Sequence, residues 1–216
     1  MDLDINYKKV KQFAKDTIKQ SNRPDFKHRD RYRHSKRVMT WATRLQELEG
    51  GNLDVVKVAA ILHDIGWDDK VNHAKVSYEL SKPFLKKLGI DKEQRKLMLE
   101  AIKYHNARTK EGLHFETYLL QDADLLDELG AMSIIWDAMA TMGEKRPSYK
   151  KAYERIKKYS GNLYKRIDDL HLESAKKIYQ TRLDFIDTFI DELEYELGIP
   201  LFLMSSAIIK YKGVMI

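Results

Sequence analysis

The sequence predicts an all-α fold, a multi-helix bundle with additional helices toward the C-terminus. Apolar residues recur every three or four positions along most of the chain. No segment of convincing length alternates apolar and polar residues, and only 10 Gly and 4 Pro interrupt 216 residues. With 43% hydrophobic and 33% charged residues, the chain can bury a sizeable core.

Apolar periodicity places helices over residues 5–20, about 30–49, 53–65, 73–88, 91–105, 114–130, 132–142, 148–159 and 171–197. The first ends at Arg23-Pro24, because the residue before proline disfavours the helical conformation, and a pair of glycines ends the second. Residues 53–65 are almost continuously apolar, which is typical of a central helix surrounded by others, and Gly66 fits its C-terminal cap.

The next two helices carry their own boundary signals. Pro83 lies inside the helix expected over 73–88 and should kink or divide it. Asp91 followed by Gln94 resembles a capping box at the start of the next helix, whose apolar face reaches His105. A glycine separates the two helices that follow, and the last expected helix is the longest amphipathic segment of the chain.

The length favours one structural unit over two full domains. We expect a main helical domain over residues 1–142, with its core at about 30–132, and a C-terminal helical extension over 143–216 packed on it. The N-terminus lacks the apolar core of a secretory signal, and the longest apolar stretch, "IPLFLMSSAII", is about half of the ~20 residues that a membrane span needs. We therefore expect a cytoplasmic protein without membrane contact.

The formal charge of +6 suits a polyanionic partner, although many soluble proteins are mildly basic. Positive residues concentrate in two segments, 19–37 and 144–160. Either segment fits a rim that attracts phosphate or a solvated helix face, and composition alone does not choose between these interpretations.

A set of ionisable side chains falls on the core-facing sides of four expected helices: His34, His63, Asp64, His105 and Asp124. Burying unpaired ionisable groups costs several kcal/mol, so a bound metal ion is a simpler explanation than five independent accidents. The chain contains no cysteine, so such a site must use histidine, carboxylate and water. Because adjacent helical residues point about 100° apart, His63 and Asp64 need ligands from other helices to complete a site.

This pattern resembles the HD-domain metal-dependent phosphohydrolases, in which an upstream His, an adjacent His-Asp pair and a downstream Asp occur in that order. The matching segments are "YRHSKRV", "AAILHDIGW" and "LLQDADLLDELGA", within residues 30–132. A weaker likeness, through His73, "AIKYHN" and the C-terminal helix, is to a largely uncharacterised bacterial and archaeal subgroup. The resemblance implies that His34, His63, Asp64 and Asp124 bind one or two divalent ions, such as Mn, Fe, Co, Ni, Mg or Zn.

The resemblance also implies roles in hydrolysis of a phosphate ester or anhydride. Asp64 would be the most central ligand, able to bridge to a second ion, and Asp68, four residues later, could accept the proton of the attacking water. His73 and His105 are either ligands of a second ion or donors to substrate phosphate. For His105, a core histidine bonded to backbone is the structural alternative, and Asp127 could orient a ligand or cap a helix.

Three cations are candidates for neutralising substrate phosphate: Arg37, Lys70 and Lys103. The chain has no Gly-rich phosphate loop, so phosphate binding must rely on metal and on such side chains. The leading hypothesis is a metal-dependent phosphohydrolase of a small phosphorylated metabolite, favouring a nucleotide at its monophosphate or pyrophosphate bond. The alternatives are a non-catalytic or regulatory module that binds nucleotide or RNA around a structural metal, and a phosphodiesterase; nucleic acid is the less favoured partner.

Overall fold

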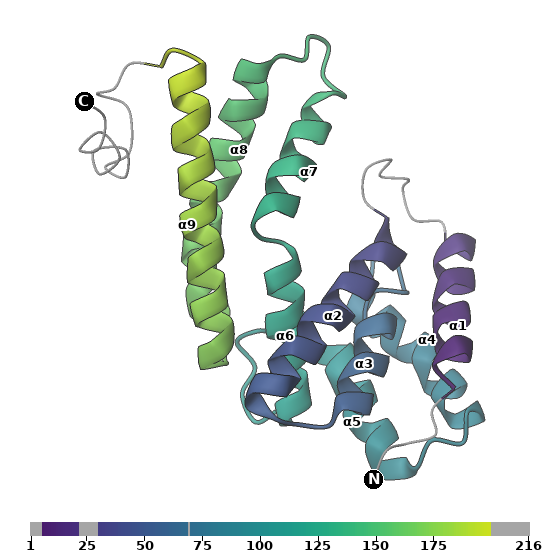
Figure 1. The fold of residues 1–216 in the computed structure, drawn as a ribbon. Coiled ribbons are helices and arrows are strands. Elements are labelled where there is room, and N and C mark those ends of the chain that lie inside the picture. The colour runs from purple at the N-terminus through teal and green to yellow at the C-terminus, as the bar shows by residue number, and fades with distance from the viewer. Residues whose placement is uncertain (1–5, 22–29, 69, 200–216) are drawn as a thin grey trace. The chain divides into compact units, whose positions relative to one another are not determined.

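The computed structural model describes residues 6–21, 30–68 and 70–199, and throughout these ranges every regular element is a helix (Figure 1). The elements are α1 (Tyr7–Gln20), α2 (Arg31–Glu49), α3 (Leu53–Leu62), α4 (His73–Lys87), α5 (Lys92–Tyr104), α6 (Phe115–Asp127), α7 (Ala131–Thr141), α8 (Tyr149–Leu163), the 3-10 helix η1 (Tyr164–Asp169) and α9 (Glu173–Glu196). The predicted all-α class is confirmed. The expected Arg23-Pro24 break and most of the apolar C-terminal stretch lie outside the described residues.

The chain divides into two units, which are described separately. Unit 1 comprises Met1–Asp127 with Asp169–Lys176, and unit 2 comprises Glu128–Asp168 with Lys177–Ile216. Helices α1 to α6 belong to unit 1, whereas α7, α8 and most of α9 belong to unit 2. The expected boundary at residue 142 and the packing of a C-terminal extension stay predictions.

Helix α3 is the centre of unit 1, as its continuous apolar sequence predicted. It packs against α1, α2, α5 and α6, and its buried residues run through most of its length. Val55, Val56 and all residues from Val58 to Leu62 are fully buried. Because most of this ten-residue helix is completely buried, its C-terminal end lies inside the core. His63 and Asp64, which follow directly, are therefore buried as well.

Side-chain caps set the starts of the unit 1 helices. Asn6, Asp30, Asn52 and Asn72 each accept a hydrogen bond from a backbone N–H in the first turn of their helix. Asp91 caps α5 by accepting from two backbone N–H groups, which is one half of the predicted capping box, whereas Gln94 Oε1 makes no return hydrogen bond. These bonds satisfy amide donors that the helix itself leaves without partners.

The region around Gly66 differs from the expectation. Helix α3 ends at Leu62 rather than near residue 65, and His63 and Asp64 form the turn that follows. Gly66 is not a left-handed cap; its N–H donates to Ser77 Oγ at 2.9 Å, and a Cβ at this position would lie 2.5 Å from Ser77 N. The glycine therefore allows the chain to pass against the backbone of α4.

Pro83 does not divide α4, which runs unbroken from His73 to Lys87. Of the two expected effects, a kink or a division, the division does not occur, because proline removes only one hydrogen bond and the flanking turns keep the helix intact; the kink stays a prediction. In unit 2, Glu194 on α9 is fully buried, and the hydroxyl of Tyr153 on α8 donates to its carboxylate at 2.6 Å.

None of the helices in the described ranges is long and apolar enough to cross a membrane.

Candidate metal centre

Residues at or near the ends of five unit 1 helices bring six ionisable side chains together. His34 lies in the first turn of α2, and Asp124 lies in α6. His63 and His105 are the C-terminal caps of α3 and α5, His73 is the first residue of α4, and Asp64 follows His63. All but His73 are buried, with exposed fractions between 1% and 8%.

One group contains His34, His63 and Asp124. One ligand atom from each lies within 4.8 Å of those of the other two, which is close enough for all three to hold one metal ion. His34 Nε2 lies 3.3 Å from Asp124 Oδ1, and His63 Nε2 lies 3.7 Å from the same oxygen. Three of the four predicted ligands therefore converge on one point.

The fourth predicted ligand, Asp64, belongs to a neighbouring group with His73 and His105. His73 Nε2 lies 3.5 Å from Asp64 Oδ1 and 3.0 Å from His105 Nε2. The two groups adjoin, because the rings of His63 and His105 meet edge to face with centroids 4.8 Å apart. The arrangement suits either one ion with Asp64 at its margin or two ions side by side.

The buried histidines share a common orientation that fits metal binding. His34 Nδ1 is 2.7 Å from Asp127 Oδ2, while Nδ1 of His63 and of His105 each lie 2.8 Å from a backbone carbonyl three residues earlier. A carbonyl accepts only from N–H, so His63 and His105 carry their proton on Nδ1 and present the Nε2 lone pair inward. Metal-binding histidines are held in this way by partners on their other nitrogen.

Three arginines contact the acidic residues of the centre. Arg31 Nη1 donates to Asp64 Oδ2 at 2.8 Å, and Arg108 Nη2 donates to Asp124 Oδ2 at 3.1 Å. Arg37 donates to both carboxylate oxygens of Asp127, at 2.7 and 2.9 Å. Sequence reasoning assigned no role of this kind to Arg31 or Arg108, because neither belongs to an apolar pattern that would place it.

The electrostatics of the centre couple His34 to its carboxylates. Burial alone would lower the pKa of His34, but hydrogen bonds to Asp124 and Asp127 raise it to about 9. Burial would raise the pKa of Asp124, but the adjacent imidazoles of His34 and His63 hold it well below its usual value. Burial, together with the nearby His63, lowers the pKa of His105 to about 3, so His105 is neutral at pH 7.

The remaining predicted residues make other contacts. Asp68 is exposed and accepts hydrogen bonds from the backbone N–H groups of Lys70 and Val71, at 2.8 and 3.1 Å. The Lys70 side chain is exposed on the same loop. Lys103 is exposed, with its Nζ near the ring of Tyr104. Arg37, which was predicted to neutralise substrate phosphate, instead donates hydrogen bonds to Asp127 as described above.

The aspartates that flank Asp124 have distinct tasks. Asp127 bonds to His34, in line with the expectation that it orients a ligand. Asp122 instead accepts from the backbone N–H groups of His171 and Leu172, which ties the segment 169–176 to α6. The sequence alone offered no signal for that contact, because the partners lie about fifty positions apart along the chain.

Comparisons with known proteins agree with this geometry. The model of the HD domain family matches residues 31–129. The chain is 25% identical over 171 residues to the uncharacterized protein YpgQ of Bacillus subtilis, covering 77% of this chain and 83% of YpgQ.

Solved structures share the fold. An HD-superfamily hydrolase from Bacillus thuringiensis superposes with a TM-score of 0.69 at 24% identity, over 89% of this chain and 97% of that protein. The structure of Bacillus subtilis YpgQ in complex with ADP superposes with a TM-score of 0.63 at 23% identity, over 88% of this chain and 93% of YpgQ. A predicted HD superfamily hydrolase from an uncultured Thermotogales bacterium superposes with a TM-score of 0.64 at 23% identity, over 88% of this chain and 92% of that protein.

Proposed function

We propose that the chain is an HD-domain protein and a divalent-metal-dependent phosphohydrolase, because residues 31–129 match the model of the HD domain family. Its proposed substrate is a small phosphorylated metabolite, namely a nucleotide cut at its monophosphate or pyrophosphate bond. One observation carries the proposal: three buried imidazoles, each tied through Nδ1, turn their Nε2 atoms toward two carboxylates in a confined space.

His34, His63 and Asp124 would hold the ion, with Asp64 as a further ligand at its margin. A divalent ion supplies Lewis-acid chemistry, by stabilising negative charge on phosphoryl oxygens and by activating water for attack. The donor set of imidazole and carboxylate suits Mn, Fe, Co, Ni, Zn or Mg without selecting one. Arg31 and Arg108 compensate the negative charge of Asp64 and Asp124 from the protein side.

The second group supports separate roles for its two histidines. His105 is neutral at pH 7 and carries its proton on Nδ1, so its Nε2 accepts a hydrogen bond or binds an ion but donates nothing to phosphate. The His73 side chain is 35% exposed, and its ring can donate to a phosphoryl oxygen that enters beside Asp64. We therefore assign substrate phosphate to His73, and a second ion or a structural bond to His105.

Asp68 remains the proposed proton acceptor for the attacking water. It is exposed and lies four residues after Asp64, in the irregular segment that follows the turn. Lys70 on the same loop is the proposed cation for the outer phosphates, whereas Arg37 acts on Asp127. A nucleotide substrate is supported by YpgQ, which was solved in complex with ADP, a ligand with a phosphoanhydride bond.

The test is release of phosphate or pyrophosphate from a panel of nucleoside mono-, di- and triphosphates by metal-stripped protein resupplied with one metal at a time. Asp64→Ala is expected to abolish turnover, and Asp68→Asn to lower kcat while metal binding is unchanged. Asp54→Asn is the matched control, because Asp54 lies at the opposite end of α3. A bound ion without turnover of any nucleotide would favour the non-catalytic module instead.

A further inference from the structure

A groove of about 320 Å³ lies on unit 1, between Tyr78 of α4 and one face of α5. The lining from α5 consists of Lys92, Arg95, Lys96, Leu99, Glu100, Lys103 and Tyr104. Positions 92, 96, 99 and 103 recur every three or four residues, so they lie along one side of the helix, where Lys92, Lys96 and Lys103 are exposed and Leu99 is buried beneath them. The described residues that line the groove lie between positions 78 and 104, outside the two basic segments that stand out in the sequence, 19–37 and 144–160.

Lysine and tyrosine side chains alternate along the groove and beyond its ends. The Nζ of Lys103 lies 5.4 Å from the ring centroid of Tyr78 and 5.0 Å from that of Tyr104. Lys82 Nζ lies 5.9 Å from Tyr78, and Lys110 Nζ lies 3.7 Å from Tyr104. The five residues form a continuous ladder, Lys82–Tyr78–Lys103–Tyr104–Lys110, which spans α4, α5 and the following loop.

The net charge of this surface is positive. The ladder and the groove together carry five lysines and Arg95, with Glu100 in the groove and Glu79 near Lys103. Asp91, Glu93 and Glu111 lie beside Lys92 and Lys110 in the sequence and offset part of this charge. Glu100 is already bonded to His114, at 2.9 Å, and to Thr117. The ammonium groups of Lys103 and Lys110 both lie close to the Tyr104 ring, and their hydrogen bonds lower the pKa of its phenol.

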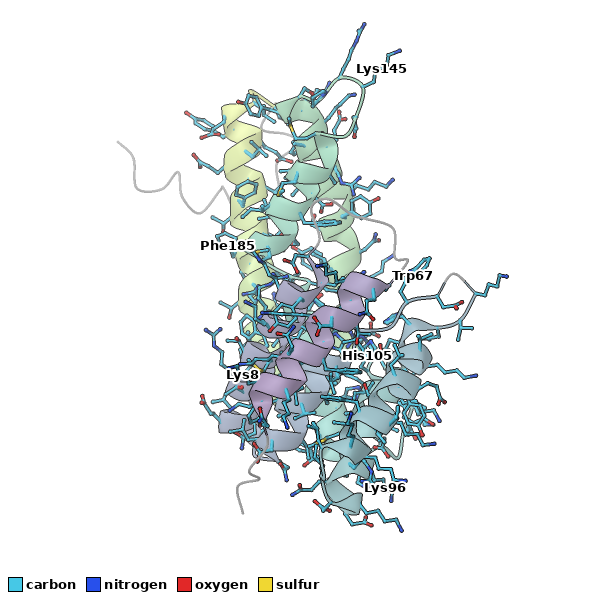
Figure 2. All side chains as sticks on the ribbon, turned by 90° about the vertical axis from the view of Figure 1, so that its right-hand side faces the viewer. Lys8, Trp67, Lys96, His105, Lys145 and Phe185 are labelled. Carbon is cyan, nitrogen blue, oxygen red and sulfur yellow. The ribbon has the colours of Figure 1, made fainter. Side chains whose placement is uncertain are left out.

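This surface is separate from the metal centre. The opposite face of α5 is buried and carries Met98, Ala101 and Ile102, and the helix ends at buried His105. Figure 2 shows Lys96 at the solvent-exposed margin of unit 1, whereas His105 lies among packed side chains. A ligand in the groove would therefore not touch the ions or the substrate of the proposed reaction.

We propose that the α4–α5 ladder binds single-stranded nucleic acid, with phosphates at the lysines and Arg95, and bases stacked on Tyr78 and Tyr104. Cations that track a backbone, interleaved with aromatic rings for successive bases, are the recurring solution for binding single strands. Both tyrosines are partly exposed, and the lysine ammonium groups that now cover the rings are on flexible stems that can move to phosphates. In a duplex the faces of the bases are stacked on one another, and inorganic polyphosphate contains no bases. Neither ligand can therefore stack on the two tyrosine rings.

The experiment measures fluorescence anisotropy of a labelled ten-nucleotide oligouridylate with the full chain in EDTA, so that metal-dependent cleavage does not interfere. Binding should weaken with salt, and removing one lysine that neutralises a phosphate should reduce the slope of log K against log salt by about 0.7. Lys96→Gln with Lys103→Gln is thus expected to lower the slope by about 1.4. Lys145→Gln with Lys150→Gln removes the same charge from unit 2 and should leave both affinity and slope unchanged.

The rings are tested separately from the charges. Tyr104→Ser is expected to weaken binding about tenfold, and Tyr104→Phe to restore it, because stacking needs the ring but not the hydroxyl. A ten-base-pair duplex or inorganic polyphosphate should bind both variants equally. Circular dichroism and thermal unfolding confirm that each variant is folded.

Three results would overturn the proposal: no binding at low salt, equal loss of affinity with the unit 2 pair, or equal affinity of Tyr104→Ser and wild type. A preference for duplex or polyphosphate over the single strand would also overturn it. Because the assay contains no metal, its failure says nothing against the proposed hydrolase, and failure of the hydrolase leaves this site standing.

Discussion

Asp127 contacts the metal centre only through another residue. Its Oδ2 atom bonds to Nδ1 of His34, and both of its oxygens accept from Arg37, which fixes the carboxylate. A carboxylate in this position orients an imidazole ligand and increases its basicity. Asp127 is therefore a positioning residue for His34.

Asp127→Asn is expected to weaken metal binding by about 10- to 100-fold while all direct ligands remain. Isothermal titration with Mn²⁺ or Co²⁺ measures this loss. Asp137→Asn is the matched control, because Asp137 also pairs with an arginine, Arg155 at 3.0 Å, but in unit 2. Equal affinities of Asp127→Asn and wild type would contradict the positioning role.

Metal affinity should depend on pH through His34. The pKa of His34 in the metal-free protein is about 9, and only the neutral ring binds an ion, so the proton must leave on binding. Affinity should rise about tenfold per pH unit between pH 7 and 9, and level off above. Titrations across this range test the slope, and a flat profile would mean that His34 is not a ligand.

The raised pKa of His34 also makes the stability of the metal-free protein depend on pH, but this stability falls as pH rises. Because the pKa of His34 rises from 6.5 on folding, its bonds to Asp124 and Asp127 stabilise the protein fully below about pH 6.5, and this contribution is lost as pH rises through about 9. Denaturant unfolding in EDTA should show the decrease in wild type. His34→Gln should show a smaller decrease over that interval, and identical profiles would contradict the assignment.

The site residues were predictable to different degrees. His34, His63, Asp64 and Asp124 follow from residue type, order and position on buried helix faces. The pairing of Arg108 with Asp124 was not predictable, because Arg108 lies in an irregular loop whose path depends on tertiary packing.

At the scale of elements, the ends of helices build the site. Helix α3 ends at Leu62, so that His63 Nδ1 bonds to the carbonyl of Ala60. The same bond recurs at the end of α5, between His105 and Ile102. Apolar periodicity predicted both helices and the end of α5 near His105, but it extended α3 past His63 to residue 65, because a helix terminus depends on local side-chain bonds.

Gly66 sets how closely the turn after α3 approaches α4. Gly66→Ala would place a Cβ 2.7 Å from the backbone carbon of Val76, so the two segments must separate. We expect a loss of stability of about 1–3 kcal/mol and weaker metal binding, since the proposed ligand Asp64 lies two residues before Gly66. Gly161→Ala is the control: it lies within α8 with open space around it and should be neutral or slightly stabilising. A Gly66→Ala protein as stable as wild type would contradict this role.

At the scale of the whole molecule, the all-α class and nearly every helix of the described residues were predictable from periodicity. The long-range bonds were not, such as those from Asp122 to His171 and Leu172, because they join segments that share no sequence pattern. All the candidate ligands lie in unit 1. Metal binding should therefore stabilise that unit directly.

An ion at 100 times its Kd should stabilise the folded protein by about 2.7 kcal/mol. Thermal unfolding at a series of Mn²⁺ or Co²⁺ concentrations measures this effect as a rising midpoint. His63→Ala removes a ligand and should lose the rise. A midpoint that rises equally in this variant would place the ion elsewhere.

The most direct test of the account is a titration of metal-stripped protein in which bound ion and nucleotide hydrolysis are measured on the same samples. The account predicts that turnover increases in proportion to the ion bound at His34, His63 and Asp124, and that His63→Ala loses both together. Full turnover in chelator-treated protein, or turnover in His63→Ala equal to that of wild type, would contradict it.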